Sequence, residues 1–135
     1  MKNMLYIVWR DESNLGIPII DEQHRAIVTT INSLHYFIQE GRGLEALLPT
    51  FNILEQYTRI HFYTEEALME RAEYTDLDKH IALHEELAKE TKRIAREASS
   101  DKEPELALRF LKEWWLDHIN GEDRHYAERV KAVLK

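Results

Sequence analysis

Histidine and carboxylate residues recur along this chain in pairs whose spacing places both side chains on one side of a helix. His61 and Glu65 are four residues apart, and so are His80 and His84. At about 100° per residue, positions i and i+4 differ by roughly 40° and lie one turn apart. Each pair can therefore point into the same small volume, where imidazole nitrogens and carboxylate oxygens could act as metal ligands. His24, which has no partner at this spacing, lies before both pairs.

The last pair has a different spacing. His118 is followed by Asp123 after five residues, within the stretch WWLDHINGED. Five residues of uninterrupted α-helix turn by roughly 140°, so Asp123 would face away from His118. An Asn-Gly sequence lies between them, and Gly121 can end a helix, while a π-bulge would also change the direction. We therefore predict a helix interruption near residues 119–122 that turns Asp123 toward the other polar side chains.

Four stretches of the chain are predicted to be the helices that position these pairs. Their apolar residues recur at steps of three or four, the pattern of an amphipathic helix with one buried face. The four series are Ile20 to Ile38, Leu47 to Leu68, Leu77 to Ala98 and Ala107 to His118. Short connections make neighbouring helices antiparallel, so we predict an all-α fold, an up-down-up-down four-helix bundle with an N-terminal arm and a short C-terminal helix. Residues 1–135 are predicted to form a single domain, with residues 1–19 as the arm and residues 20–135 as the bundle.

Several residues are predicted to begin helices. Asp21 can cap the first helix, and Thr75 with Asp78 resembles a capping box before the third. Pro104 suits the first turn of the fourth helix. These residues set the expected helix boundaries.

Composition excludes several classes of function. The 135 residues carry 18 lysines and arginines against 25 aspartates and glutamates, a net charge of −7, which argues against nucleic acid as a partner. Because the chain has no cysteine, it has neither disulfides nor thiolate metal ligands. The apolar run from Met4 to Trp9 is too short for a signal sequence or a membrane-spanning helix, so we expect a cytoplasmic protein without a membrane partner. No protein partner is predicted.

Polar residues interrupt the apolar face of all four predicted helices. They are His24, His61, Glu65, His80, His84 and His118. Each buried polar group without a partner costs about 1–3 kcal/mol, so a core that holds six of them needs something that satisfies all of them together. A metal does this, and nitrogen and oxygen ligands without sulfur suit iron, manganese, copper or zinc. Five histidines with carboxylates exceed the needs of one octahedral ion, which favours two ions.

Three other polar residues are not predicted to be ligands. Glu66 points away from the direction shared by His61 and Glu65, and we expect it either behind the ligands or on the surface. His35 and His125 match no ligand position and are interpreted as structural.

The chain resembles a single-domain bacterial hemerythrin. The resemblance runs from GIPIIDEQH (16–24) through HFYTEEALM (61–69) and HIALH (80–84) to WWLDHINGED (114–123). A single HxxxE or HxxxH arises often by chance, but a lone His, HxxxE, HxxxH and HxxxxD in this order form a specific pattern. The resemblance implies a non-haem centre of two iron ions.

The resemblance also implies a role for each residue of the pattern. His80, His84 and His118 would hold one iron, and His24 and His61 the other. Glu65 and Asp123 would bridge the two, together with an oxo or hydroxo group. Six ligands on the first iron and five on the second leave one open position, where dioxygen would bind.

The same positional match implies an apolar dioxygen pocket. It would be lined by Ile27, Phe62, Trp114, Trp115 and Ile119. These residues could equally be ordinary core residues of a bundle, and the two interpretations are compatible. The family usually has leucine three residues before the last histidine, whereas this chain has Trp115. We therefore expect a pocket of different width or gating.

Three functions are considered. The favoured one is reversible dioxygen binding by a carrier, store or scavenger that is not an enzyme. The alternatives are an oxygen- or redox-sensing domain and a di-iron enzyme acting on peroxide or nitric oxide. Sensing domains of this family are usually fused to signalling domains, and the sequence ends twelve residues after Asp123, so a stand-alone binding protein is expected.

Overall fold

The structure, a computed structural model, describes residues 5–134, except for the side chains of residues 118–122. The described part is helical and contains no strand. In chain order its elements are the 3₁₀ helix η1 (Asp11–Ser13), the helices α1 (Pro18–Gln39), α2 (Gly43–Arg71), α3 (Leu77–Ser100) and α4 (Pro104–Glu113), the π-helical segment η2 (Trp114–Asn120), and α5 (Gly121–Leu134).

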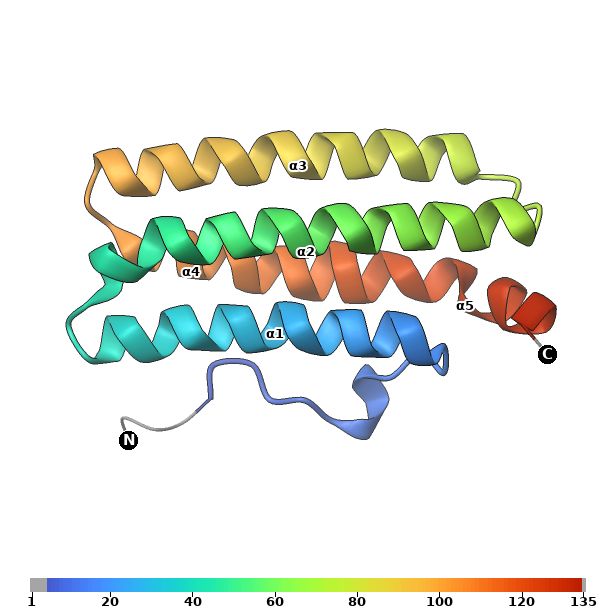
Figure 1. Ribbon diagram of the computed structural model, residues 1–135, viewed down its shortest axis with the longest axis horizontal. Coiled ribbons are helices and arrows are strands. Elements are labelled where there is room, and N and C mark those ends of the chain that lie inside the picture. Colours follow the sequence, from blue (N-terminus) through green and yellow to red (C-terminus); the bar gives the residue numbers. More distant parts are fainter. Residues whose placement is uncertain (1–4, 135) are drawn as a thin grey trace.

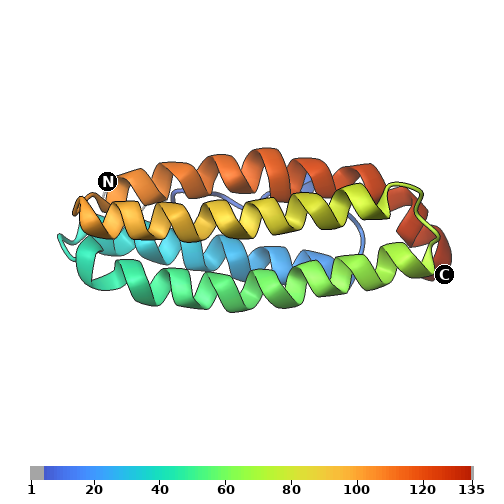
Figure 2. The same ribbon diagram turned by 90° about the horizontal axis from the view of Figure 1, so that it is seen from above.

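The four long helical rows run antiparallel to their neighbours (Figure 1). Helix α1 packs against α2, α2 against α3, and α3 against α4, and α4 returns to α1 and closes the bundle. Figure 2 shows the same rows from above, with short turns at both ends. The predicted all-α, up-down-up-down bundle is confirmed, and α5 is the expected C-terminal helix.

The first helix begins earlier than the sequence suggested. Helix α1 starts at Pro18, so the prediction that Asp21 caps it is wrong. Asp21 lies in the first turn, and its carboxylate accepts hydrogen bonds from the backbone N–H groups of Leu15 (2.7 Å) and Gly16 (3.1 Å). Gly16 has φ +89°, a conformation that side chains disfavour. Asp21 therefore ties the end of the N-terminal arm to α1 instead of capping the helix.

Of the two other predicted helix starts, one is right and one is wrong. Helix α4 begins at Pro104, as predicted. Helix α3 begins at Leu77 with Asp76 at its N-cap position, and that cap makes no side-chain hydrogen bond, so the capping box of Thr75 and Asp78 is wrong. A local cap adds only about 1 kcal/mol, and tertiary packing can override it.

The predicted interruption near residues 119–122 takes another form. The chain stays helical from Pro104 to Leu134, and the irregularity is the π-helical turn η2, which begins earlier, at Trp114. Hydrogen bonds of the i→i+5 type widen a helix by one residue per turn and change its direction without a break. The π-bulge considered as an alternative is therefore what the backbone adopts. Asp123 is buried rather than turned to solvent.

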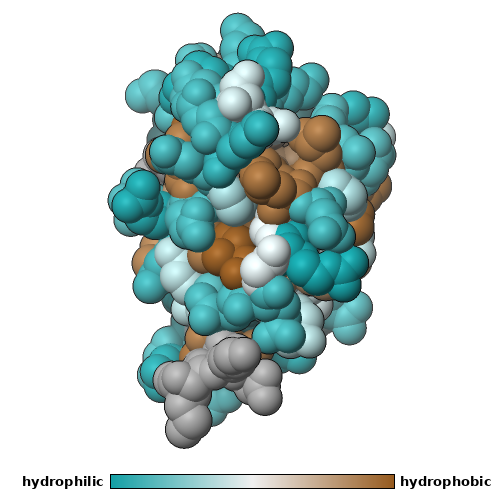
Figure 3. Space-filling model, turned by 90° about the vertical axis from the view of Figure 1, so that its left-hand side faces the viewer, coloured by the Kyte–Doolittle hydropathy of each residue, from teal (hydrophilic) through white to brown (hydrophobic). Residues whose placement is uncertain are grey.

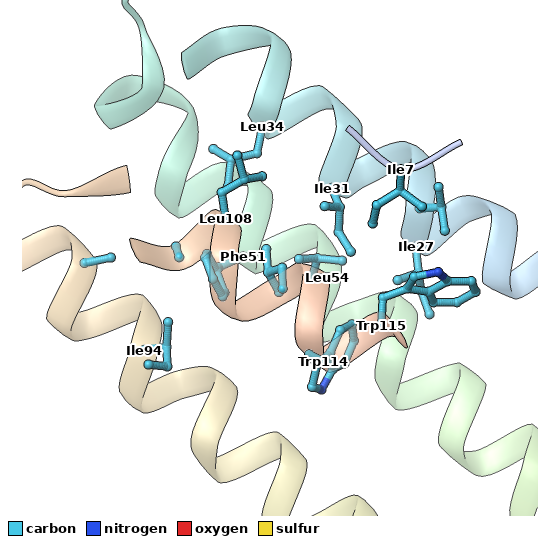
Figure 4. Close-up of a cluster of buried hydrophobic side chains, with 14 of the residues drawn as sticks. Ile7, Ile27, Ile31, Leu34, Phe51, Leu54, Ile94, Leu108, Trp114 and Trp115 are labelled. Atoms are coloured by element: carbon cyan, nitrogen blue, oxygen red, sulfur yellow. The ribbon is translucent and has the colours of Figure 1, made fainter. Parts of the chain in front are cut away.

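Two hydrophobic clusters fill the bundle. The larger includes Ile27, Ile31 and Leu54 together with Ile7 of the arm (Figure 4). Phe62 and Leu111 also belong to it. The smaller includes Ile17, Ile20, Met69, Tyr126 and Val130. On α1 and α2 the polar residues fall between these clusters in sequence, because His24 separates Ile20 from Ile27 and Glu65 precedes Met69. The apolar core is thus divided by a polar layer.

The outer surface is mostly hydrophilic. Figure 3 shows the end of the bundle that is at the left of Figure 1, where hydrophilic side chains surround smaller hydrophobic areas. None of the helices described between residues 5 and 134 is both long and apolar enough to cross a membrane.

Leu54 tests the larger cluster, because it is fully buried on α2. Leu54→Ala should lower the free energy of unfolding by about 2–5 kcal/mol, the usual cost of a large cavity in a core. Leu48→Ala makes the same change on the same helix at a half-exposed position and should cost less than about 1 kcal/mol. Urea unfolding of the two metal-free variants measures the difference, and equal costs would contradict the assignment of Leu54 to the core.

Candidate metal centre

The polar layer collects side chains from four helices. His24 comes from α1, His61 and Glu65 from α2, His80 and His84 from α3, and Asp123 from α5. All six are buried, with His24, His61 and Glu65 fully removed from solvent. The helical spacing of four therefore brings each predicted pair to the inside of the bundle.

Four of these residues form a compact group. One ligand atom each from His24, His61, Glu65 and Asp123 lies within 4.8 Å of all the others. The Nε2 atoms of His24 and His61 are 3.2 Å apart. Oδ2 of Asp123 is 2.8 Å from Nε2 of His24 and 3.2 Å from Nε2 of His61. Three lone-pair-bearing atoms therefore face one another in a buried space.

These distances fit the edges of a metal coordination polyhedron. Histidine and carboxylate ligands bind a first-row metal such as zinc at about 2.1 Å, so neighbouring ligands at right angles are roughly 3.0 Å apart. The three measured separations lie between 2.8 and 3.2 Å. A hydrogen-bond network explains them less well, because with the His61 proton on Nδ1 both atoms of the 3.2 Å contact between His61 Nε2 and Asp123 Oδ2 are acceptors.

Glu65 lies between the two sets of histidines. Its Oε1 atom is 3.4 Å from Nε2 of His61 and 3.2 Å from Nε2 of His84. This oxygen is fully buried and has no regular hydrogen bond within the described part of the chain. A buried carboxylate oxygen without such a bond is costly, and it is well placed to bridge two cations.

Hydrogen bonds fix the rings of two histidines. His61 Nδ1–H donates to Oε1 of Gln23 (2.9 Å), and Gln23 in turn donates to the Thr64 hydroxyl (3.1 Å). His84 Nδ1–H donates to a Glu66 carboxylate oxygen (2.7 Å). With the proton on Nδ1, the Nε2 lone pair of each ring points to the centre, the tautomer that a metal requires. Glu66 thus lies behind a predicted ligand, one of its two expected positions.

Tyr126 of α5 completes the surroundings of Glu65. Its hydroxyl donates a short hydrogen bond to Oε2 of Glu65, and its side chain is fully buried. The ring also lies edge-on to that of His80, with 5.7 Å between centroids. One carboxylate oxygen of Glu65 is thereby held by the protein, which leaves Oε1 directed toward the histidines.

Burial and neighbouring charges keep the layer in a metal-binding protonation state. Burial, together with the nearby His61, lowers the pKa of His24 to about 3. Burial also lowers the pKa of His61, although Glu65 opposes this. Burial by itself would raise the pKa of Glu65, but the neighbouring His61 and His84 and the hydrogen bond from Tyr126 outweigh it and hold that pKa below its ordinary value. The neutral imidazoles of His24 and His61 thus face an ionised carboxylate.

Of the two remaining predicted ligands, His80 and His118, the structure describes the side chain of His80 only. His80 is buried beside His84, with 5.3 Å between ring centroids. The side chain of His118 lies outside the described residues, and so does that of Ile119, so both remain predictions.

Four of the five predicted pocket residues belong to the larger hydrophobic cluster. These are Ile27, Phe62, Trp114 and Trp115. The Trp115 ring meets the His24 ring edge-on, with 5.0 Å between centroids. Phe62 stacks flat on His84 at 3.9 Å. Trp115 lies beside Ile27, whereas Trp114 points in another direction (Figure 4).

The two remaining histidines lie away from this group. The ring of His35 stacks on Tyr6 of the arm, with 5.0 Å between centroids, and His125 is exposed. Both placements agree with the structural interpretation.

Two residues that form hydrogen bonds with the proposed ligands were not predicted from the sequence. Gln23 adjoins His24, and Tyr126 follows Asp123 by three, so proximity along a helix was the available signal. A glutamine or tyrosine at such a spacing is common in any helix, and only the structure connects Gln23 to His61 and Tyr126 to Glu65.

Comparisons with known proteins agree with this geometry. The family model described as "Hemerythrin HHE cation binding domain" matches residues 15–130. A bacteriohemerythrin of Stenotrophomonas maltophilia is 38% identical over 133 residues, which cover 97% of this chain and 86% of the relative. A bacteriohemerythrin of Pseudomonas aeruginosa is 36% identical with the same coverage. The myohemerythrin of Theromyzon tessulatum is 26% identical over 122 residues, covering 90% of this chain and 92% of that protein.

The buried histidines predict an acid-sensitive metal-free protein. Because the pKa of His24 falls from an ordinary 6.5 to about 3 on folding, the unfolded chain binds a proton between these values that the folded chain does not. Stability should therefore be lost as pH falls below 6.5, by up to about 1.4 kcal/mol per pH unit. Hydrogen bonds to Glu65 and Glu66 raise the pKa of His84 despite its burial, so its contribution is fully present below 6.5 and does not cause this loss.

Urea unfolding of the metal-free protein at a series of pH values measures this slope. His24→Leu removes the titrating group and should give a shallower dependence on pH below 6.5. Identical slopes in the two proteins would contradict the assignment to His24.

Proposed function

This chain belongs to the hemerythrin family, and from that premise we propose that it binds dioxygen reversibly as a carrier, store or scavenger. The family binds oxygen at a non-haem di-iron site. We further propose that His24, His61, Glu65 and Asp123 surround one iron, and that His80, His84 and His118 hold the other with the same two carboxylates as bridges. The protein would act by binding rather than by catalytic turnover.

The observation that carries the proposal is the compact group of His24, His61, Glu65 and Asp123. It supplies four ligands, two nitrogens and two carboxylate oxygens. A five-coordinate metal would need one more ligand, and a six-coordinate metal would need two more. With a bridging oxygen atom, a six-coordinate iron here would have one position left for an external ligand. The second set, with three histidines, leaves no such position.

The pair of iron ions supplies the reversible two-electron chemistry that dioxygen binding requires. The protein contributes a fixed and dry environment. Neutral imidazoles outnumber the carboxylates in the layer, and this favours the lower oxidation state. Trp115 and Ile27 pack at the His24 side and keep water and protons away from the bound ligand.

The size of the side chain at position 115 is expected to affect the rate at which a ligand enters and leaves the site. Trp115 occupies a position where relatives are expected to have leucine, and its ring contacts that of His24. An oxygen molecule that approaches the proposed open position from the His24 side would have to pass this ring or displace it. Dioxygen is thus the partner we propose for the site, and a cytoplasmic location remains a prediction.

Removal of the bridging carboxylate should reduce iron binding. Glu65→Gln keeps the size of the side chain but loses its charge and one acceptor oxygen, so the iron bound per chain should fall well below two. Glu70→Gln makes the same change one turn and a half further along α2 at an exposed position and should leave iron content unchanged. Metal analysis by mass spectrometry, with circular dichroism to verify folding, distinguishes the two. Full iron occupancy in Glu65→Gln would remove the bridge from the proposal.

Cycling the protein between dioxygen and argon tests the function itself. The di-ferrous protein, prepared without oxygen, should develop visible charge-transfer bands with oxygen and lose them under argon over repeated cycles. Irreversible oxidation on first exposure would favour a sensor or an enzyme instead. Zinc in place of iron after growth in iron-replete medium would contradict all three functions.

A further inference from the structure

At its Nδ1 side, His24 is held by packing and not by a hydrogen bond, whereas its Nε2 faces Asp123 at 2.8 Å. The Nδ1 atoms of His61 and His84 donate to Gln23 and Glu66, whereas Nδ1 of His24 is buried without a hydrogen-bond partner in the described part of the chain. The ring of Trp115 instead lies edge-on against His24 (interplanar angle 88°). On this side of the ring, the contact with Trp115 therefore takes the place of the hydrogen bond that the other two histidines make.

Trp115 is in turn backed by Trp9 of the N-terminal arm. The centroids of the two indoles are 5.9 Å apart. The guanidinium of Arg25 also contacts Trp9, at 5.2 Å from the ring centroid. Trp115 is 2% exposed, whereas Trp9 is only half-buried. The arm thus places one tryptophan between solvent and the tryptophan that contacts His24.

The arm crosses the seam between α1 and α4. Its backbone is held at Ile7, whose N–H donates to the Asn32 side chain (2.8 Å) and whose C=O accepts from it (2.9 Å). Tyr6 stacks on His35 of α1 and meets the ammonium group of Lys112 of α4 at 4.8 Å. The side chain of Ile7 points into the larger cluster near Ile27 (Figure 4).

The arm is attached at these points but is not packed along its whole length. A hollow of about 340 Å³ lies between it and α1, lined by Ile7, Trp9, Arg25 and Val28 among others. A segment held at separate points with a hollow beside it opens at lower free-energy cost than the core.

We propose that the arm is a strap whose Trp9 holds Trp115 against His24 and so controls access of small ligands to the metal centre. When Trp9 lies on Trp115, the seam between α1 and α4 is closed. When the strap lifts, Trp115 is free to rotate away from His24 and a path opens. Trp9 is a positioning residue, because it acts on the site through Trp115. The inference rests on the proposed function for its ligand, dioxygen, but the strap itself does not depend on bound metal.

A second route to the centre competes with this one. A groove of about 660 Å³ between α2 and α3 reaches Phe62 and His84 from another side of the bundle. It approaches His84, a proposed ligand of the other iron, which would have no open position. The two routes predict different responses to substitution.

Fluorescence of the metal-free protein tests the strap without any iron. Trp9→Phe and Trp9→Ala leave the same two tryptophans, 114 and 115, so their emission is directly comparable. Acrylamide should quench Trp9→Ala several-fold more strongly than Trp9→Phe, because phenylalanine still covers Trp115 and alanine does not. Equal quenching constants in the two folded variants would overturn the strap.

Asn32→Ala provides an independent variant that leaves Trp9 in place. It releases the backbone of Ile7 and should raise acrylamide quenching above that of the wild-type metal-free protein. If Trp9→Ala does not fold, as judged by circular dichroism, this comparison alone decides the question. Quenching equal to wild type would then overturn the strap.

Oxygen kinetics of the iron-loaded protein test the access route. The rate of dioxygen association, followed by stopped flow, should rise several-fold in Trp9→Ala and stay near the wild-type value in Trp9→Phe. Ala88→Phe narrows the groove between α2 and α3 at an exposed lining residue and should leave the rate unchanged. Slower association in Ala88→Phe, with Trp9→Ala at the wild-type rate, would assign access to the groove instead. Failure to bind oxygen at all would contradict the proposed function, while the quenching result would still test the strap.

Discussion

The fold is built around the burial of ionisable groups in the middle of an apolar core. Ionised carboxylates and unpaired imidazoles are among the most costly groups to remove from water. Here they form one layer between two hydrophobic clusters, and every helical row contributes to it. The apolar clusters supply the free energy of folding on both sides, and bound cations compensate the layer itself. A bundle of this kind therefore trades stability for a binding site, and the free energy of metal binding becomes part of the free energy of folding.

The protein supports this layer in two different ways. Around His61 and His84, polar partners fix the rings from behind through Gln23 and Glu66. Around His24, aromatic packing does so through Trp115 and the N-terminal arm. A hydrogen bond fixes a ring in one orientation, whereas packing fixes it only while the packed neighbour stays in place. His24, whose Nδ1 makes no hydrogen bond within the described residues, lies on the side where an external ligand is proposed to bind.

The helical periodicity of the sequence was enough to predict the bundle, and the spacing of polar residues was enough to find most of the layer. Both depend on patterns that repeat over a whole helix, so many residues contribute to each. Helix starts at Asp21 and Thr75 were wrong, because a cap is worth little compared with tertiary packing, and Asp21 proved to bind the arm. Gln23, Tyr126 and Trp9 were not predicted as parts of the site. Their roles arise from contacts between residues up to 106 positions apart, such as Trp9 with Trp115, and no local spacing encodes such contacts.

The π-helical turn changes which residues of α5 face the core. Measured from Leu111 at about 100° per residue, an uninterrupted α-helix would place Asp123 roughly 120° away and Val130 roughly 100° away, on the flank of the helix. If the wide turn absorbs one residue, the same positions fall at roughly 20° and 0°, in line with Leu111. Both residues are indeed buried. Residues before and after the π-helical turn therefore keep the same helical spacing of buried positions. Across the turn, however, the series of buried positions is offset by one residue.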